Sequence, residues 1–122
     1  MSRASSEKLI RAYYTALSIG DTGGLLKLLD DGVIHDTSGG VREFGKETFR
    51  QRFEEDRRSR QEAAHDLVVM SDKEGRRLAA EFTIMGRNLE SGQEYGLSGG
   101  AFFLIDERKI LRVTEYRNDT SG

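Results

Sequence analysis

The first half of the chain carries apolar residues at helical spacing. The first run begins after Ser5 and Ser6, which are candidate N-caps, and ends at Gly20. Its apolar residues are Leu9, Ile10, Tyr13, Ala16 and Leu17. A second, shorter run begins at Asp21 or Thr22, carries four leucines and ends at residues 30–32. A third run, over residues 46–60, shows a narrow apolar stripe of Phe49 and Phe53. The pattern therefore predicts three helices, of which the third keeps one face in water.

In the second half the apolar period changes to two, which is typical of strands. Strands are expected at residues 67–70, 78–85, 101–105 and 110–116, and turn residues separate them. Shorter strands are expected at residues 33–37 and 41–44. Gly96, Gly99 and Gly100 precede residues 101–105 in the third long strand and predict bulges that bend the sheet. Helices followed by a bent, antiparallel meander indicate an α+β fold.

Composition narrows the range of functions. The 122 residues fit a single domain, 1–122, and the net charge of -2 gives no overall attraction to nucleic acid or anionic membranes. The chain has no cysteine, which excludes disulfides and thiol catalysis. No apolar run approaches the roughly 20 residues of a membrane span. We therefore expect a cytoplasmic protein.

Five segments resemble one known family. They are residues 13–21 (YYTALSIGD), 28–36 (LLDDGVIHD), 40–49 (GVREFGKETF), 99–103 (GGAFF) and 109–116 (KILRVTEY). Together they are similar to ketosteroid-isomerase-like proteins of the nuclear-transport-factor-2 (NTF2-like, SnoaL-like) superfamily, closest to the subgroup called ketosteroid-isomerase-related proteins. The resemblance implies a cone in which a strongly curved sheet wraps three N-terminal helices around a cavity. It also implies a homodimer that packs sheet against sheet.

The resemblance specifies the fold better than the activity, because this fold hosts isomerases, polyketide cyclases, epoxide hydrolases, dehydratases and binding modules. We expect a pocket for a small apolar molecule. Two classes of function follow: a cofactor-free isomerase or cyclase that transfers protons on a small carbonyl compound, or a non-catalytic binding or dimerisation module. An open, polar cavity that contains Asp36 favours the enzyme, and a cavity filled by side chains favours the module.

Asp36 is the first candidate catalytic residue. It follows Val33 and Ile34 at the end of a predicted strand, where burial would raise its pKa and suit it as a general base. By resemblance it falls at the isomerase's proton-shuttling carboxylate if the preceding loop is one residue shorter; otherwise Thr37 takes that position. The alternative is an aspartate that caps the turn at residues 38–40.

Tyr13 is the second candidate, because the resemblance matches it to a tyrosine that donates a hydrogen bond to the substrate oxyanion. Its neighbour Tyr14 points elsewhere on the helix, and we expect one of the two, Tyr13 first, to face inward. Tyr14, Phe53, Phe82 and Phe103 are the candidates for binding the apolar substrate.

One departure from the family limits the expected activity. Ala101 occupies the position of the isomerases' second oxyanion donor, a protonated carboxylic acid, and alanine cannot donate a hydrogen bond. Steroid isomerisation is therefore expected to be weak or absent. Glu115 and Arg117 share a strand face and are expected to form ion pairs on a solvated or interface surface.

Two other kinds of site are not supported. His35 and His65 lack the spacing of metal ligands, so no metal is expected, and His35 should face opposite to Asp36 on its strand. Residues 40–46 (GVREFGK) fit the spacing of a phosphate-binding loop. However, Glu47 follows where Ser or Thr is needed, and no buried parallel strand precedes it, so we reject nucleotide binding.

Overall fold

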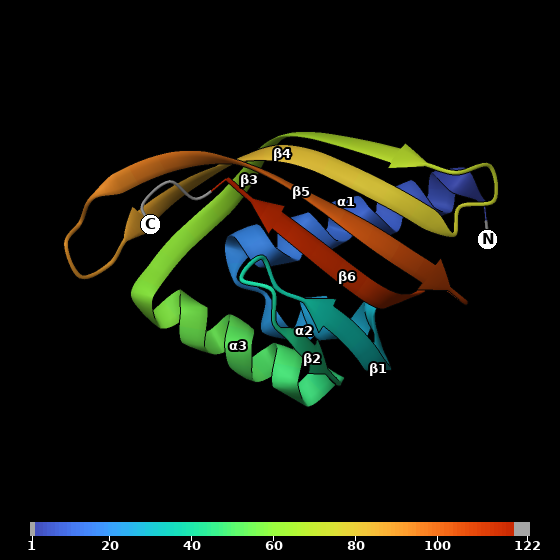
Figure 1. Cartoon of the computed structure of the whole chain (residues 1–122), viewed down its shortest axis with the longest axis horizontal. Coiled ribbons are helices and arrows are strands. Elements are labelled where there is room, and N and C mark those ends of the chain that lie inside the picture. Colours follow the sequence, from blue (N-terminus) through green and yellow to red (C-terminus); the bar gives the residue numbers. More distant parts are fainter. Residues whose placement is uncertain (1, 119–122) are drawn as a thin grey trace.

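The computed structural model describes residues 2–118 (Figure 1). The elements are α1 (Arg3–Ile19), α2 (Thr22–Lys27), β1 (Leu29–Asp36), β2 (Arg42–Phe44), α3 (Lys46–Ser59), β3 (Arg60–Ser71), β4 (Arg77–Asn88), β5 (Glu94–Asp106) and β6 (Lys109–Arg117). The predicted order of three helices and six strands is confirmed, and most bounds move by only a few residues.

The six strands form one sheet in the order β2-β1-β6-β5-β4-β3. Every neighbouring pair is antiparallel except β1 and β6, which run parallel. The sheet is curved and unclosed, and α1, α2 and α3 lie on its concave side (Figure 1). The predicted α+β architecture is confirmed.

Alternation along the strands decides which side chains face the helices. In β4, Leu78, Ala80, Phe82 and Ile84 are buried, while Glu81 between them is exposed. The core lies between this concave face and α1, whose Ile10 and Tyr13 are almost completely buried. Burying each large apolar side chain contributes about 1.5–3 kcal/mol, so this layer is the main source of stability. No helix among residues 2–118 is long and apolar enough to cross a membrane.

Helix α1 begins at a different residue from its sequence prediction. Ser2, not Ser5 or Ser6, is the N-cap, and Ser2 and Ser5 form a reciprocal capping box. Ser6 is buried and donates a hydrogen bond of 2.6 Å to the carbonyl of Gly75. The helix ends at Gly20 in the left-handed region (φ 75°), as predicted.

The predicted bulges at the glycines of β5 are wrong, because β4 and β5 pair without a register shift from Arg77 to Arg87. Register shifts lie elsewhere: in β3 between His65 and Val68, where Asp66 has a φ of 55°, in β5 between Leu104 and Ile105, and in β1 between Leu29 and Ile34. Two glycines make room for rings on the concave face. A Cβ atom on Gly99 would lie 2.5 Å from the ring of Phe82, and one on Gly86 would lie within 2.4 Å of the Tyr95 ring.

Candidate active site

A cavity of about 370 Å³ lies between the helices and the concave face of the sheet. Its aromatic lining residues are Tyr13, Tyr14, Phe49, Phe53, Phe82 and Tyr116. Its ionisable lining residues include His35, Arg52, Asp56, Arg60, Glu62, Glu115 and Arg117. Side chains do not fill the space, and the lining combines an aromatic wall with several charged groups. The cavity is open and carries charged groups, but Asp36 is not among its lining residues, so it meets only part of the condition that favours an enzyme.

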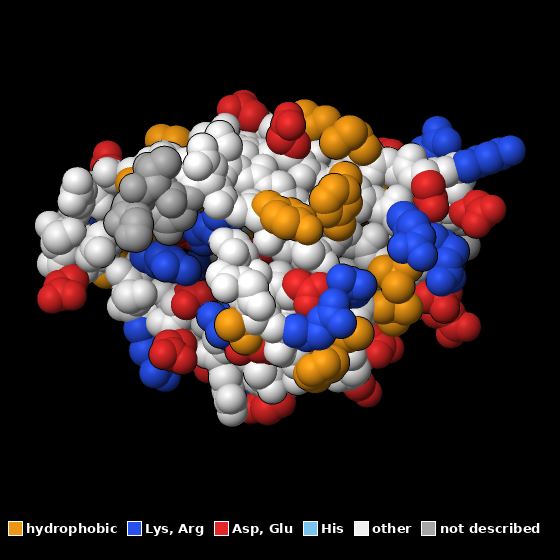
Figure 2. All heavy atoms as spheres, viewed as in Figure 1, with side chains coloured by type: hydrophobic (Ala, Val, Ile, Leu, Met, Phe, Trp, Pro, Cys, Tyr) orange, Lys and Arg blue, Asp and Glu red, His pale blue; other side chains and the backbone are white. Residues whose placement is uncertain are grey.

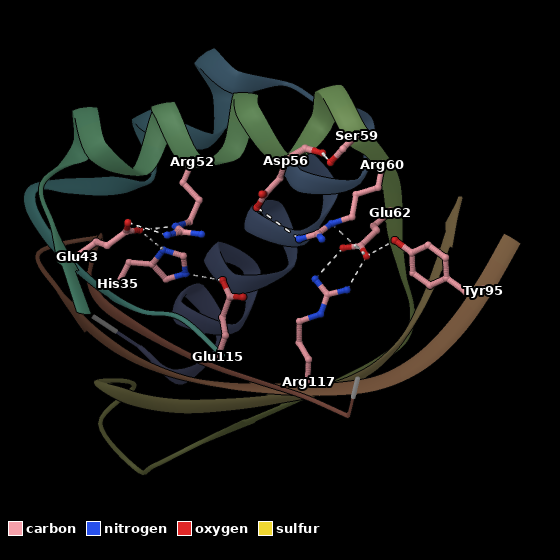
Figure 3. Close-up of polar contacts among 10 residues, drawn as sticks. All are labelled: His35, Glu43, Arg52, Asp56, Ser59, Arg60, Glu62, Tyr95, Glu115 and Arg117. Carbon is pink, nitrogen blue, oxygen red and sulfur yellow. Dashed lines mark hydrogen bonds and ion pairs between the residues drawn. The ribbon is translucent and has the colours of Figure 1, made fainter. Parts of the chain in front are cut away.

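His35 and Glu115 form the central polar contact of the cavity (Figure 3). His35 lies on β1 and Glu115 on the neighbouring β6, and their Nε2 and Oε1 atoms are 2.7 Å apart. Because a carboxylate only accepts, Nε2 carries the proton and donates it. The side chain of Glu115 is 30% exposed, whereas that of His35 is only 8% exposed. The carboxylate of Glu115 is therefore the member of the pair that a ligand can reach.

The other ring nitrogen of His35 faces a second carboxylate. Nδ1 is buried without a hydrogen bond and lies 4.0 Å from Oε1 of Glu43. Glu43 is itself held by Arg52, which donates from Nη2 at 2.8 Å. The ring of His35 also packs on Phe49, with centroids 4.8 Å apart. These contacts fix the imidazole, and the imidazole in turn fixes the orientation of Glu115.

Tyr13 and Tyr14 both line the cavity, so the expectation that only one of them faces inward is wrong. Their rings meet edge to face at 5.0 Å. Burial raises the pKa of each phenol, and the nearby charge of Glu115 raises it further. Both hydroxyls therefore stay protonated at neutral pH. Within residues 2–118, no side-chain hydrogen bond involves either hydroxyl, and both residues line the cavity, so both hydroxyls are available as donors for a ligand.

The three predicted phenylalanines separate into two roles. Phe53 on α3 and Phe82 on β4 line the cavity, as expected for walls that contact an apolar ligand. Phe103 does not line it. Phe103 lies behind the tyrosines, with ring centroids 5.4 Å from Tyr13 and 6.0 Å from Tyr14. It supports the two phenols from the core instead of forming the wall.

A second polar cluster, made of Glu62, Arg117 and Tyr95, contributes Glu62 and Arg117 to the cavity lining (Figure 3). Glu62 on β3 accepts from Arg117 at 2.9 Å and from the hydroxyl of Tyr95 at 2.5 Å. Burial alone would raise the pKa of Glu62, but these hydrogen bonds outweigh it and lower the pKa below its usual value. Burial and the bond to Glu62 raise the pKa of Tyr95 to about 12. The cluster ties β3, β5 and β6 together.

Asp36 does not line the cavity. Strand alternation places it opposite to His35, as predicted for that pair, and so on the convex face of the sheet. Its carboxylate accepts from Arg42 at 2.6 Å, from Thr114 at 2.9 Å and from Arg112 at 3.0 Å. The hydrogen bond from Arg42 is the main reason that its pKa lies well below the usual range. The prediction of a raised pKa is therefore wrong, while Thr37, the alternative, does line the cavity.

Arg117 forms an ion pair, with Glu62, as expected, but the solvated or interface face expected for Glu115 and Arg117 is wrong. They lie two and four residues after the fully buried Val113 along β6, on the same face of the strand, and therefore point into the cavity. This spacing from Val113 was the sequence signal that could have placed them on the inner face. Ala101 is buried directly opposite Glu115 in the β5–β6 register, so a carboxyl group is present one strand away from the expected position. Among residues 2–118, no group of three or more potential ligands could hold a metal.

The fold and the cavity define the class of protein: a small α+β protein whose fold is shared by solved structures described as an NTF2-like protein and as a candidate isomerase. The chain belongs to the SnoaL-like domain family, whose family model matches residues 10–113. No curated protein matches the chain in sequence.

Solved structures agree with this assignment. A candidate polyketide cyclase from Xanthomonas campestris is 35% identical, covers 97% of this chain and 93% of its own length, and superposes with a TM-score of 0.93. A second, from Pseudomonas putida, is 41% identical over 97% of this chain and 92% of its own, with a TM-score of 0.90. An epoxide hydrolase-like protein of M. tuberculosis shares the fold at 15% identity, covers 94% of this chain and 84% of its own, and has a TM-score of 0.81.

Proposed function

We propose that this protein is a cofactor-free enzyme of the isomerase or cyclase type, which transfers a proton on a small carbonyl compound with Glu115 as general base. One observation carries the proposal. A carboxylate that reaches the cavity is held by a buried histidine and lies beside two phenols that have no protein partner. Asp36, the base expected from the sequence, is replaced in this role because it lies on the convex face.

The position of Glu115 suits proton abstraction from carbon. The hydrogen bond from His35 fixes one carboxylate oxygen, and the other oxygen is left for a substrate C–H group. A general base must lie within hydrogen-bond reach of the proton that it removes, and a fixed carboxylate avoids the cost of reorientation. Enolisation next to a carbonyl is the reaction class that this arrangement fits.

Tyr13 and Tyr14 supply the complementary donors. When Glu115 removes a proton, negative charge develops on the carbonyl oxygen of the substrate, and neutral hydroxyls in a cavity stabilise that charge. Ala101 contributes no donor, so the two tyrosines carry this role together. Phe53 and Phe82 offer apolar surface for the substrate body. The names of the two similar candidate polyketide cyclases support a carbonyl substrate.

The test is exchange of the α-protons of 1-indanone into heavy water, followed by proton NMR. We expect the wild-type protein to accelerate exchange, and Glu115→Gln to reduce it by about 100- to 10,000-fold, the usual contribution of a general base. Glutamine still accepts the bond from His35, so the fold is kept. Glu81→Gln, at an exposed residue on β4, is the matched control and should exchange as wild type does. If the protein binds 1-indanone but does not accelerate exchange, the proposal of an enzyme is overturned and the protein is a binding module.

We also propose a homodimer that packs the convex faces of two sheets together. Apolar side chains gather on this face (Figure 2), including Phe102 and Tyr116, which are more than half exposed and lie 5.9 Å apart. Val68 and Met70 on β3 are also about half exposed. Sedimentation at tens of micromolar, the range of common interface affinities, should show a dimer. Phe102→Glu should give a monomer, and a wild-type monomer would refute the proposal.

A further inference from the structure

Arg57, on α3, is the unusual cation of the cavity. Four arginines line this space, and the other three each pair with a carboxylate of the protein (Figure 3). The pairs are Arg52 with Glu43, Arg60 with Asp56, and Arg117 with Glu62. Glu115, the remaining carboxylate of the lining, is held by His35. Among residues 2–118, Arg57 is therefore the cavity cation that pairs with no carboxylate of the protein.

The guanidinium of Arg57 has one edge free for a ligand. Within the described part of the chain, its hydrogen bond goes from Nη1 to the carbonyl of Leu17, at 3.2 Å, and the edge formed by Nε and Nη2 donates to no protein group. In Arg42 the same two atoms donate together to the carboxylate of Asp36, at 2.6 Å and 3.1 Å. Two parallel donors match the two oxygens of a carboxylate. Arg57 therefore presents an unoccupied edge of the kind that binds carboxylates elsewhere in this chain.

Two neighbours restrict the position of this guanidinium. Gly20 ends α1, and a Cβ atom there would lie 2.5 Å from both Cζ and Nη2 of Arg57. The missing side chain at Gly20 lets the guanidinium lie against the backbone. Cζ also lies 5.8 Å from the ring centroid of Phe53, which lines the cavity. A cation held beside an aromatic wall suits a ligand whose apolar body carries an acidic group.

We propose that Arg57 binds a carboxylate, and that the substrate of this cavity is a carbonyl compound that also carries a carboxylate group. The anion site stands on the contacts of Arg57, whereas calling its occupant the substrate rests on the proposed function. A carboxylate brings the single negative charge that one guanidinium balances. A doubly charged phosphate would leave one charge unbalanced in a lining that already holds Asp56, Glu62 and Glu115, so a carboxylate is favoured.

The experiment compares 3-oxoindane-1-carboxylate, a carboxylated form of 1-indanone, with its uncharged methyl ester by calorimetry. We expect the wild-type protein to bind the carboxylate about tenfold more tightly, the effect of charge-assisted hydrogen bonds at a partly exposed arginine. Arg57→Gln should bind the carboxylate about tenfold more weakly than wild type and the ester within about twofold. Arg58→Gln, at the exposed next residue, removes the same charge and is the control, which should keep both affinities within about twofold of wild type.

Equal affinity of the wild-type protein for the two compounds, or binding of neither, overturns the inference, and this comparison needs no variant to fold. Equal weakening of both in Arg57→Gln also overturns it, because Arg57 would then only support the end of α1 through Leu17. An equal loss of carboxylate binding in Arg58→Gln would show long-range attraction and not a site.

Failure of the proposed function gives a different result. If 3-oxoindane-1-carboxylate binds in this Arg57-dependent way but the protein does not accelerate exchange of its α-protons in heavy water, the enzyme is overturned and the anion site stands. Accelerated exchange without any preference for the carboxylate overturns the inference alone.

Discussion

Replacing Asp36 by asparagine tests the assignment of this residue to the outside of the cavity. In the folded protein, its carboxylate accepts hydrogen bonds from Arg42, Arg112 and Thr114. Asparagine keeps the shape but loses the charge that both arginines face. Hydrogen bonds to a charged group are worth about 1.5–3 kcal/mol each when buried. Arg42 and Arg112 are nearly half exposed, however, and solvent screening reduces the sum to about 1–2 kcal/mol.

The sign of the pH dependence follows from the lowered pKa of Asp36. A carboxyl whose pKa is lower in the folded than in the unfolded protein contributes stability above its unfolded pKa of about 3.9, and loses it as pH falls through the folded value. Thermal or urea unfolding should therefore show Asp36→Asn less stable than wild type near neutral pH. The difference should shrink in acid, below about pH 3. A variant that is equally or more stable at neutral pH would refute this reasoning and would revive the buried base that the sequence suggested.

Two further substitutions test the walls of the cavity. Gly99→Ala should destabilise the protein by about 1–3 kcal/mol in urea unfolding, because a Cβ atom would lie 2.5 Å from the Phe82 ring. Gly96→Ala on the same strand meets only an ordinary contact at 3.5 Å and should cost less, so an equal cost for both would contradict the argument. Tyr14→Phe should weaken binding of 2-naphthol, an enol mimic, by about fivefold with little change in stability, since a neutral hydrogen bond contributes about 1 kcal/mol. Unchanged affinity, measured by calorimetry, would show that this hydroxyl donates to no ligand.

The sequence predicted the architecture because its apolar periods were clear. The change from helical spacing before residue 60 to alternation after it defines the three helices and the sheet that wraps them. Some bounds were missed where tertiary packing overrides local signals. Asp30, Asp31 and Gly32 indicated a loop, yet they lie within β1, because Leu29 and Val33 on either side are fully buried.

The site was harder to predict than the fold, since a shift of one residue along a strand moves a side chain to the other face. Such a one-residue difference on β1 explains why Asp36 was predicted as the cavity residue, although it is His35 that faces the cavity. The aromatic wall was predicted more successfully, because Tyr13, Tyr14, Phe53 and Phe82 do line the cavity. Glu115 and Asp56 come from β6 and α3, and no local pattern indicates that they approach one another across a cavity.

The central claim is that Glu115, and not Asp36, is the carboxylate that acts on a substrate. The most direct test measures α-proton exchange of 1-indanone by Glu115→Gln and Asp36→Asn side by side, at a temperature where both are fully folded. We predict that Glu115→Gln loses about 100- to 10,000-fold of the enzymatic rate, whereas Asp36→Asn exchanges within about twofold of wild type. Loss of exchange in Asp36→Asn, with exchange retained in Glu115→Gln, would contradict the account.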